Sequence, residues 1–187
     1  MTAAGSTQWL WFVSRGSGLV LFVLLSIVVT LGIAARTGAA PRTWRRFTTA
    51  ELHRSLALFA VAFLALHVVT AVLDPYVSIG WWATFVPFVS PYRTAALGAG
   101  ALVVDLGAAV VASSLLRDRL GYRAWRLVHW AAYAAWPIAL VHALKAGNDL
   151  AIGWVAVLVW GSAALVATAV VARVLDGLRP HAEAPAR

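Results

Sequence analysis

Long stretches without charged residues alternate with short charged segments along this chain. Five of them are each about as long as the roughly 20 residues that an α-helix needs to cross the hydrocarbon core of a bilayer. They run from 16 to 35, 55 to 73, 94 to 116 (interrupted by Asp105), 127 to 144 and 150 to 172. Because lipid offers the backbone no hydrogen-bond partner, each stretch is predicted to be a helix. We therefore expect an all-α polytopic membrane bundle that forms one domain over residues 1–187.

Signals at the ends of these stretches set the expected boundaries. We place the spans at 16–35, 49–73, 94–116, 123–144 and 150–172. The run Thr48-Thr49-Ala50-Glu51 follows a capping-box pattern, which would start the second helix near Thr49. The first 14 residues lack the positive segment of a secretory signal, so we expect the first span to be retained. A polar tail from about Leu178 is expected to be disordered.

The longest connection, residues 74–93, is rich in prolines and large aromatic side chains. It holds Pro75, Trp81, Trp82, Phe85, Pro87, Phe88 and Pro91. Aromatic side chains favour the boundary between membrane and water, and prolines interrupt regular structure. We expect this segment to form a cap in the interface instead of a separate domain.

Composition agrees with a membrane protein and narrows its chemistry. Hydrophobic residues make up 62% and charged residues 12% of the chain, where a soluble domain has about 25% charged. Cysteine is absent. The absence of thiols excludes disulfides, thiolate metal sites, iron–sulfur clusters and haem attached through thioether bonds.

The net charge of +8 is distributed unequally over the connections. Twelve of the fifteen basic residues fall on one predicted side, namely Arg36, Arg42, Arg45, Arg46, Arg54, Arg117, Arg119, Arg123, Arg126, Arg173, Arg179 and Arg187. Only Arg15, Arg93 and Lys145 fall on the other. The positive-inside rule places the larger group in the cytoplasm, with the N-terminus outside and the C-terminus inside. The charge is thereby explained without a nucleic-acid partner.

Four of the five histidines lie on two predicted spans, and His181 lies in the tail. His53 and His67 are 14 residues apart, and His129 and His142 are 13 apart. A step of 14 returns to the same face in a bundle wound to about 3.5 residues per turn. It also separates two side chains by about 21 Å along the axis. His53 and His67 are therefore expected to face one neighbouring helix at two depths.

The second and fourth spans run in the same direction, so their histidines match in depth. His53 is expected to meet His129 near the cytoplasmic side, and His67 to meet His142 near the outer side. Haem iron takes two axial nitrogens, so two such pairs predict two stacked bis-histidine haems. A single histidine in a membrane helix is also compatible with a packing role, but four at matched depths favour ligands.

The step of 13 leaves His129 and His142 about 140° out of phase in an ideal helix. Pro137 lies between them, and a proline inside a helix bends it. We expect this distortion to bring both histidines toward the second span.

These histidine segments carry a resemblance to a known family. The segments "ELHRSLALFAVAFLALHVVT" and "LGYRAWRLVHWAAYAAWPIALVHAL" are similar to the two histidine helices of the ferric reductase-like transmembrane domain family. The family includes ferric reductases, the NADPH oxidase membrane core and the haem-binding subunit of a bacterial methionine-sulfoxide reductase system. The resemblance implies haem b, most simply two, and electron transfer within a bacterial-type inner membrane. Many members have six spans, where five are expected here.

The resemblance leaves donor and acceptor open. No phosphate-cradling glycine motif follows a strand, so no flavin or nicotinamide domain is expected on this chain. A separate cytoplasmic flavoprotein or a membrane quinol would supply electrons, and the external acceptor could be ferric iron, oxygen, a quinone or a partner protein. Whether the chain is itself an enzyme or an oxidoreductase component is therefore open. Two alternatives are a quinol-linked subunit with one haem serving a periplasmic oxidoreductase, and a proton-coupled transporter without haem.

Further residues are candidates for supporting roles. Arg54, Arg126 and Arg93 could hold haem propionates, with Lys145 and Arg15 as outer alternatives, although helix-end placement also explains these cations. Trp136 lies midway between His129 and His142 and could sit between the haems or fill the core.

Small and acidic residues inside the spans complete the candidates. Gly16, Gly18, Gly98, Gly100 and Gly107 allow close backbone approach or make room beside a haem. Asp105 lies near the bilayer centre, where an ionised carboxylate costs about 3 kcal/mol or more. It is a candidate for proton transfer or for tuning a histidine, and a protonated, hydrogen-bonded carboxyl is the alternative.

Overall fold

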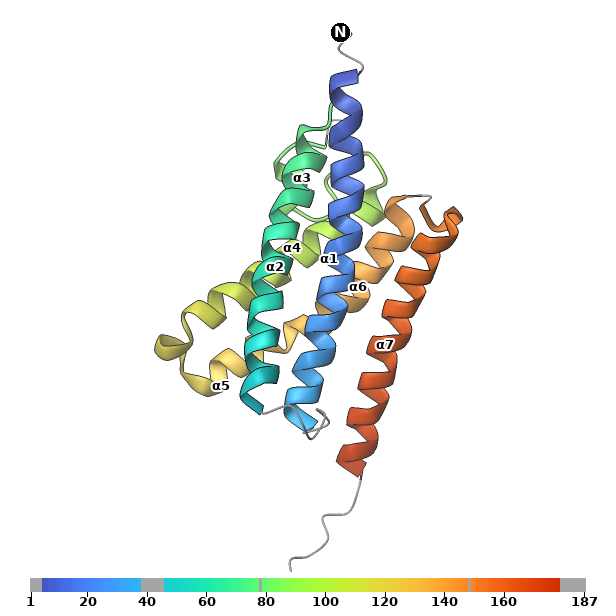
Figure 1. Cartoon of the computed structure of the whole chain (residues 1–187). Coiled ribbons are helices and arrows are strands. Elements are labelled where there is room, and N and C mark those ends of the chain that lie inside the picture. The colour runs from blue at the N-terminus through green and yellow to red at the C-terminus, as the bar shows by residue number, and fades with distance from the viewer. Residues whose placement is uncertain (1–4, 38–45, 78, 148, 179–187) are drawn as a thin grey trace, which may run out of the picture.

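The computed structural model describes residues 5–37, 46–77, 79–147 and 149–178 (Figure 1). Its helices are α1 (Gly5–Thr37), α2 (Arg46–Leu73), α3 (Trp82–Phe85), α4 (Thr94–Leu115), α5 (Arg117–His129), α6 (Ala131–Ala146) and α7 (Gly153–Leu178), with a short 3-10 helix at Asp149–Ala151. The described residues contain no strand. Five segments are long and apolar enough to cross a membrane, with α5 and α6 together forming one of them. The prediction of an all-α membrane bundle with five spans is confirmed.

Helix α1 lies at the centre of the arrangement, between α2 and α7 (Figure 1). It also contacts α6, and α6 packs in turn against α4. Two small apolar clusters join α1 to α7, one around Phe22, Val155 and Val159 and one around Val29, Ile33 and Val166. Helix α1 therefore touches α2, α6 and α7, which together include three of the four intramembrane histidines.

Helix α1 begins at Gly5, well before the expected start at residue 16. Trp9 and Trp11 therefore lie on the helix instead of in a preceding segment, and both are exposed. The segment contains no glycine or proline between Gln8 and Arg15, so nothing in it interrupts helical backbone. The first span is extended toward the N-terminus by more than two turns of helix.

Helix α2 begins at Arg46, so the capping-box prediction for Thr49 is wrong. Thr49 lies inside the helix with 1% of its surface exposed, and its hydroxyl has no hydrogen-bond partner among the described residues. A threonine serves as an N-cap only if its own backbone is non-helical. His53 is accordingly two turns inside the helix, deeper than expected.

The fourth span is broken into two helices at Trp130. Helix α5 ends at His129 and α6 begins at Ala131. Pro137 lies within α6, so the break falls upstream of the expected position. Proline has no N–H to donate to the carbonyl four residues earlier, that of Tyr133, and its ring crowds that carbonyl. On the other side of the same peptide turn, the Tyr133 N–H donates to the Trp130 carbonyl at 3.0 Å, which is a tighter turn than that of an α-helix.

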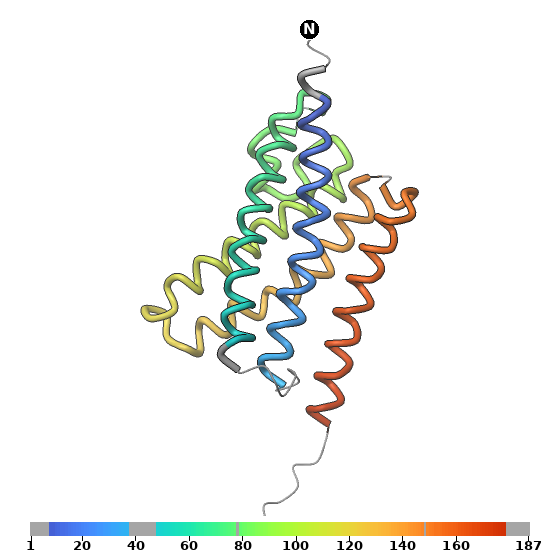
Figure 2. Tube along the Cα trace, viewed as in Figure 1, coloured from blue at the N-terminus to red at the C-terminus, as the bar shows by residue number. Residues whose placement is uncertain are grey.

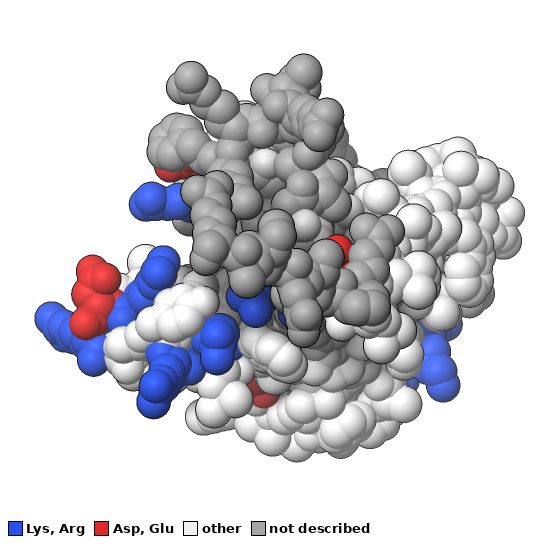
Figure 3. Space-filling model, turned by 90° about the horizontal axis from the view of Figure 1, so that it is seen from below, with Lys and Arg blue, Asp and Glu red and all other residues white. Residues whose placement is uncertain are grey.

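Helix α5 projects from the bundle on the side away from α7 (Figure 2). A residue with positive φ, Gly121, interrupts it near its start, and α5 contains no buried residue. Figure 3 shows Lys and Arg gathered at one edge of this end of the molecule, and α5 carries four exposed arginines, Arg117, Arg119, Arg123 and Arg126. Helix α5 is thus the most basic and least packed part of a span.

Candidate histidine pairs inside the bundle

The four intramembrane histidines form two pairs, joined as the sequence predicted. The ring centroids of His53 on α2 and His129 on α5 are 6.2 Å apart. Those of His67 on α2 and His142 on α6 are 6.1 Å apart. The two pairs lie at separate depths, since 14 helical residues rise about 21 Å.

Both separations fit two axial imidazoles on one metal ion. A metal–imidazole bond is about 2.0 Å long, and the ring centre lies about 1.15 Å beyond the nitrogen, so two coaxial imidazoles have centroids about 6.3 Å apart. No group of three or more His, Cys, Asp or Glu side chains suited to a metal ion occurs in the described ranges. Haem iron needs only two ligands from the protein, because the porphyrin supplies the other four.

Three of the histidines are held in the form that binds a metal. Nδ1 of His53 donates to the Val28 carbonyl at 3.0 Å, and Nδ1 of His67 donates to the Ser14 carbonyl at 2.7 Å. Nδ1 of His142 donates to the Ala96 carbonyl at 2.7 Å. A carbonyl oxygen only accepts, so the proton must lie on Nδ1 in each case. The lone pair of Nε2 is then free for a metal, and the ring is fixed in orientation.

A glycine lies four residues after two of these carbonyls on α1. A Cβ built on Gly18 would lie 2.9 Å from both Cε1 and Nδ1 of His67, and one on Gly32 would lie 3.4 Å from Cε1 of His53. In a helix the carbonyl of residue i points toward residue i+4. Glycine there leaves the carbonyl open from the side, and an imidazole fills the space.

The same arrangement recurs on α4. A Cβ built on Gly100 would lie 2.8 Å from Cε1 and Nδ1 of His142, and Gly100 follows Ala96 by four residues. A glycine and the carbonyl four residues before it thus form one seat for a histidine ring, and the described chain contains three. The two seats on α1 are 14 residues apart, matching the spacing of His53 and His67.

His129 is the exception. Its Nδ1 is buried and has no hydrogen-bond partner within the described ranges. Its ring instead packs against Trp125, one turn earlier on α5, with centroids 5.0 Å apart and planes tilted by 32°. The break at Trp130 nevertheless points His129 toward His53, although Pro137 was the expected site of the distortion.

The predicted propionate cations lie near both ends of the bundle. Arg54 and Arg126 are exposed on α2 and α5, and the Arg126 guanidinium lies over the Tyr122 ring. At the end of the bundle that is predicted to face outward, Arg93 donates to the Lys145 carbonyl at 3.0 Å. Arg15 is paired with Asp149, which ties α1 to the connection before α7. Arg54, Arg126 and Arg93 have no carboxylate partner among the described residues and keep their charge available.

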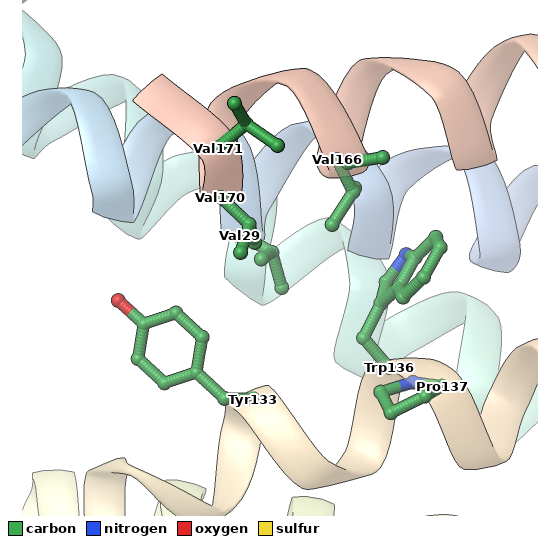
Figure 4. A pocket seen from close by; sticks show the side chains of 8 residues that line it. Val29, Tyr133, Trp136, Pro137, Val166, Val170 and Val171 are labelled. Atoms are coloured by element: carbon green, nitrogen blue, oxygen red, sulfur yellow. The ribbon is translucent and has the colours of Figure 1, made fainter. Parts of the chain in front are cut away.

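Trp136 packs against α1 and α7. Its Nε1 donates to the Ser26 hydroxyl at 2.8 Å, and its ring stacks on Phe22 with centroids 5.8 Å apart. Ser26 and Phe22 lie about 90° around α1 from the stripe that seats His53 and His67. The indole also lines an apolar groove of about 370 Å³ between α6, α7 and α1 (Figure 4). These contacts support core filling.

Asp105 is half-buried on α4 and makes no hydrogen bond or ion pair with another described residue. Its role therefore stays a prediction. Gly98 receives the ring of Phe88 from the outer cap, whereas Gly16 has no heavy atom within 4 Å of a built Cβ. His181 lies outside the described residues.

The family comparison agrees with this geometry. The family model described as "Ferric reductase like transmembrane component" matches residues 17–140, which include three of the paired histidines. No curated protein and no solved structure matches the chain.

Proposed function

The chain belongs to the ferric reductase-like transmembrane family, and from this premise we propose that it is a b-type cytochrome that carries electrons across the bilayer. His53 and His129 would hold one haem, and His67 and His142 a second. The chain is a multi-pass membrane protein, and the family indicates electron transfer within the membrane. The assignment of haem b, its number and the ligands is our proposal.

One observation carries the proposal. Two imidazole pairs lie at the separation that an iron ion requires, and three of the four rings have Nδ1 bonded to a carbonyl. Histidines that merely pack have no need of a second histidine at this distance or of a free Nε2. Haem would supply a reversible one-electron centre at each depth.

The protein's part is to bind, orient and shield. The glycine seats fix the ring planes, and the carbonyl bonds keep the ligands neutral and basic. Arg54 and Arg126 on the inner side and Arg93 on the outer side would balance propionate charge. Two sites about 21 Å apart along α2 would put one centre near each membrane surface.

Electrons would enter from a separate cytoplasmic flavoprotein or a membrane quinol and leave to an external acceptor. The four exposed arginines of α5 support a cytoplasmic position for that end, in a bacterial-type inner membrane. Ferric iron, oxygen, a quinone or a partner protein each remain eligible acceptors.

Haem content of the purified protein tests the proposal. We expect a reduced-minus-oxidised spectrum of haem b and about two haems per chain. His67→Ala and His142→Ala should each remove the outer haem, and His53→Ala and His129→Ala the inner one. His181→Ala is the matched control and should keep both. A colourless protein, or haem retained fully in His53→Ala/His67→Ala, would contradict the proposal.

A second candidate keeps one haem only. The missing Nδ1 bond of His129 favours it, because an unanchored ligand binds more weakly. In this form the His67–His142 pair alone would hold haem in a quinol-linked subunit for a periplasmic oxidoreductase. A haem-to-chain ratio near one that His129→Ala leaves unchanged would select it.

A further inference from the structure

The four histidines are unequally held, and the difference falls on one member of the inner pair. We propose that His129 is an exchangeable ligand, and that a small neutral iron ligand enters the His53–His129 site by replacing it. This inference rests on the proposed function, since it assumes that both pairs hold haem. The seats on α1 and α4 show why one ligand differs.

The position that would seat His129 can be found from the repeat of 14 residues. On α1 the two carbonyls are those of Ser14 and Val28, and the two glycines are Gly18 and Gly32. On α4 the outer seat consists of the Ala96 carbonyl and Gly100. A shift of 14 residues from Ala96 and Gly100 places the corresponding inner seat at Val110 and Ser114.

This fourth seat is closed by two serines. The Ser114 hydroxyl donates to the Val110 carbonyl at 2.7 Å, and the Ser113 hydroxyl donates to the same oxygen at 3.0 Å. Trp125 occupies the space on the His129 side, because its Nε1 donates to the Ser114 hydroxyl at 3.3 Å and its ring packs on His129. The hydroxyls and Cβ atoms of these serines thus cover the Val110 carbonyl, whereas the carbonyl of each other seat is open to a histidine ring.

The backbone around His129 is also less restrained than that around His142. His129 is the last residue of α5, which has no buried residue and contains the non-helical Gly121. Its neighbours Leu127 and Trp130 are 77% and 59% exposed. His142 lies inside α6, which packs along α4. The His129 ring lies at the end of a loosely packed helix and its Nδ1 makes no hydrogen bond among the described residues. The ring can therefore turn away from His53 at low cost.

The exchange itself needs no other reactant. The iron that this pair would hold would lose its bond to His129 Nε2 and gain one to the entering ligand, and His129 would leave as a neutral imidazole. No proton or electron is transferred. His53 would stay bound, because the Val28 carbonyl and Gly32 hold that ring in place.

Carbon monoxide is the probe, because it binds ferrous haem only where an axial position can be vacated. The purified protein is reduced with dithionite and titrated with carbon monoxide, and the bound fraction is read from the absorption spectrum. We expect carbon monoxide to bind about half of the haem, with the other half remaining six-coordinate with two histidines.

A pair of variants that differ by one methyl group locates the site. Ser113→Ala/Ser114→Gly frees the Val110 carbonyl and opens the space beside it, so His129 gains a seat and carbon monoxide binding falls at least tenfold. Ser113→Ala/Ser114→Ala removes the same hydroxyls but keeps the Cβ, and should still bind carbon monoxide at half of the haem. Gly100→Ala closes the outer seat and should extend binding toward all of the haem.

The experiment distinguishes failure of the proposed function from failure of ligand exchange at His129. A protein without haem contradicts the function itself. A protein with two haems that binds carbon monoxide at neither or at both overturns the inference alone, as does unchanged binding in the serine-to-glycine variant at full haem content. If Gly100→Ala does not accumulate, the serine pair decides the matter by itself.

Discussion

At each histidine of α2, a glycine of α1 lies against the imidazole ring. Gly18 is the tighter case, since an added Cβ would lie 2.9 Å from two atoms of the His67 ring. The ring would have to leave the Ser14 carbonyl, which removes the bond that fixes its tautomer. Loss of such an outer bond costs about 10- to 100-fold in metal affinity.

We therefore expect Gly18→Ala to lower the affinity for haem of the outer pair by about 10- to 100-fold. Haem titration of the apoprotein, followed by absorption, measures this change. Gly16→Ala is the matched control, because a Cβ there meets no heavy atom within 4 Å. Equal haem binding by both variants would show that the seat has no part in holding His67.

The histidine pairing was predictable at the residue scale, and the seats were not. Matched depth follows from 14- and 13-residue spacing and from the direction of the spans. A seat joins residues 25 to 53 positions apart, so it depends on which helix lies beside which. Gly18 and Gly100 attracted notice as small residues, but only the structure shows that each faces an imidazole ring. A glycine repeat of 14 opposite a histidine repeat of 14 is the signal that sequence offers.

Among the elements, α1 and α6 are joined by one polar contact inside an apolar bundle. The Trp136 indole donates to Ser26, and Ser26 is fully buried. Ser26→Ala leaves the indole N–H without its acceptor, which costs about 1–3 kcal/mol. We expect that loss in the free energy of unfolding, measured by denaturant titration in micelles. Thr168→Ala removes an exposed hydroxyl bonded within α7 and should change stability by less than about 0.5 kcal/mol.

The break in the fourth span leads to a second prediction at the scale of the elements. Pro137→Ala restores the N–H that bonds the Tyr133 carbonyl and favours one continuous helix. His129 would then turn about 140° out of phase with His142. We expect the inner pair to lose haem and the outer pair to keep it, giving about one haem per chain by pyridine haemochrome assay. Pro91→Ala, in the outer cap, should keep both haems.

Element boundaries illustrate where sequence reasoning stops. Hydropathy found each span because the bilayer sets a minimum apolar length. The start of α2 at Arg46 and the break at Trp130 depend instead on local hydrogen bonds among residues of similar propensity. The capping motif at Thr49 was wrong because the helix had already begun. Phase correction by Pro137 was expected, but a break about two turns before that proline was not.

For the whole molecule, the distribution of arginines predicts its orientation in the membrane. The chain has no cysteine, so single introduced cysteines report which side they face. We expect a membrane-impermeant maleimide to label Trp82→Cys in intact cells, and to label Arg119→Cys only after permeabilisation. The unmodified chain is the control and should take up no label. Reversed labelling would contradict the predicted orientation and move the His53–His129 pair to the outer side.

The seats also fix an order of assembly. Helices that offer carbonyls, α1 and α4, precede α2 and α6, whose histidines they receive, and a chain emerges from the ribosome N-terminus first. Each of the three seated imidazoles therefore reaches the membrane after its partner backbone is already in place. Helix α7 contributes no ligand and no seat within the described residues. Biogenesis can thus complete the proposed ligand set before α7 is made, and α7 would close over a scaffold that is ready to receive the proposed haems.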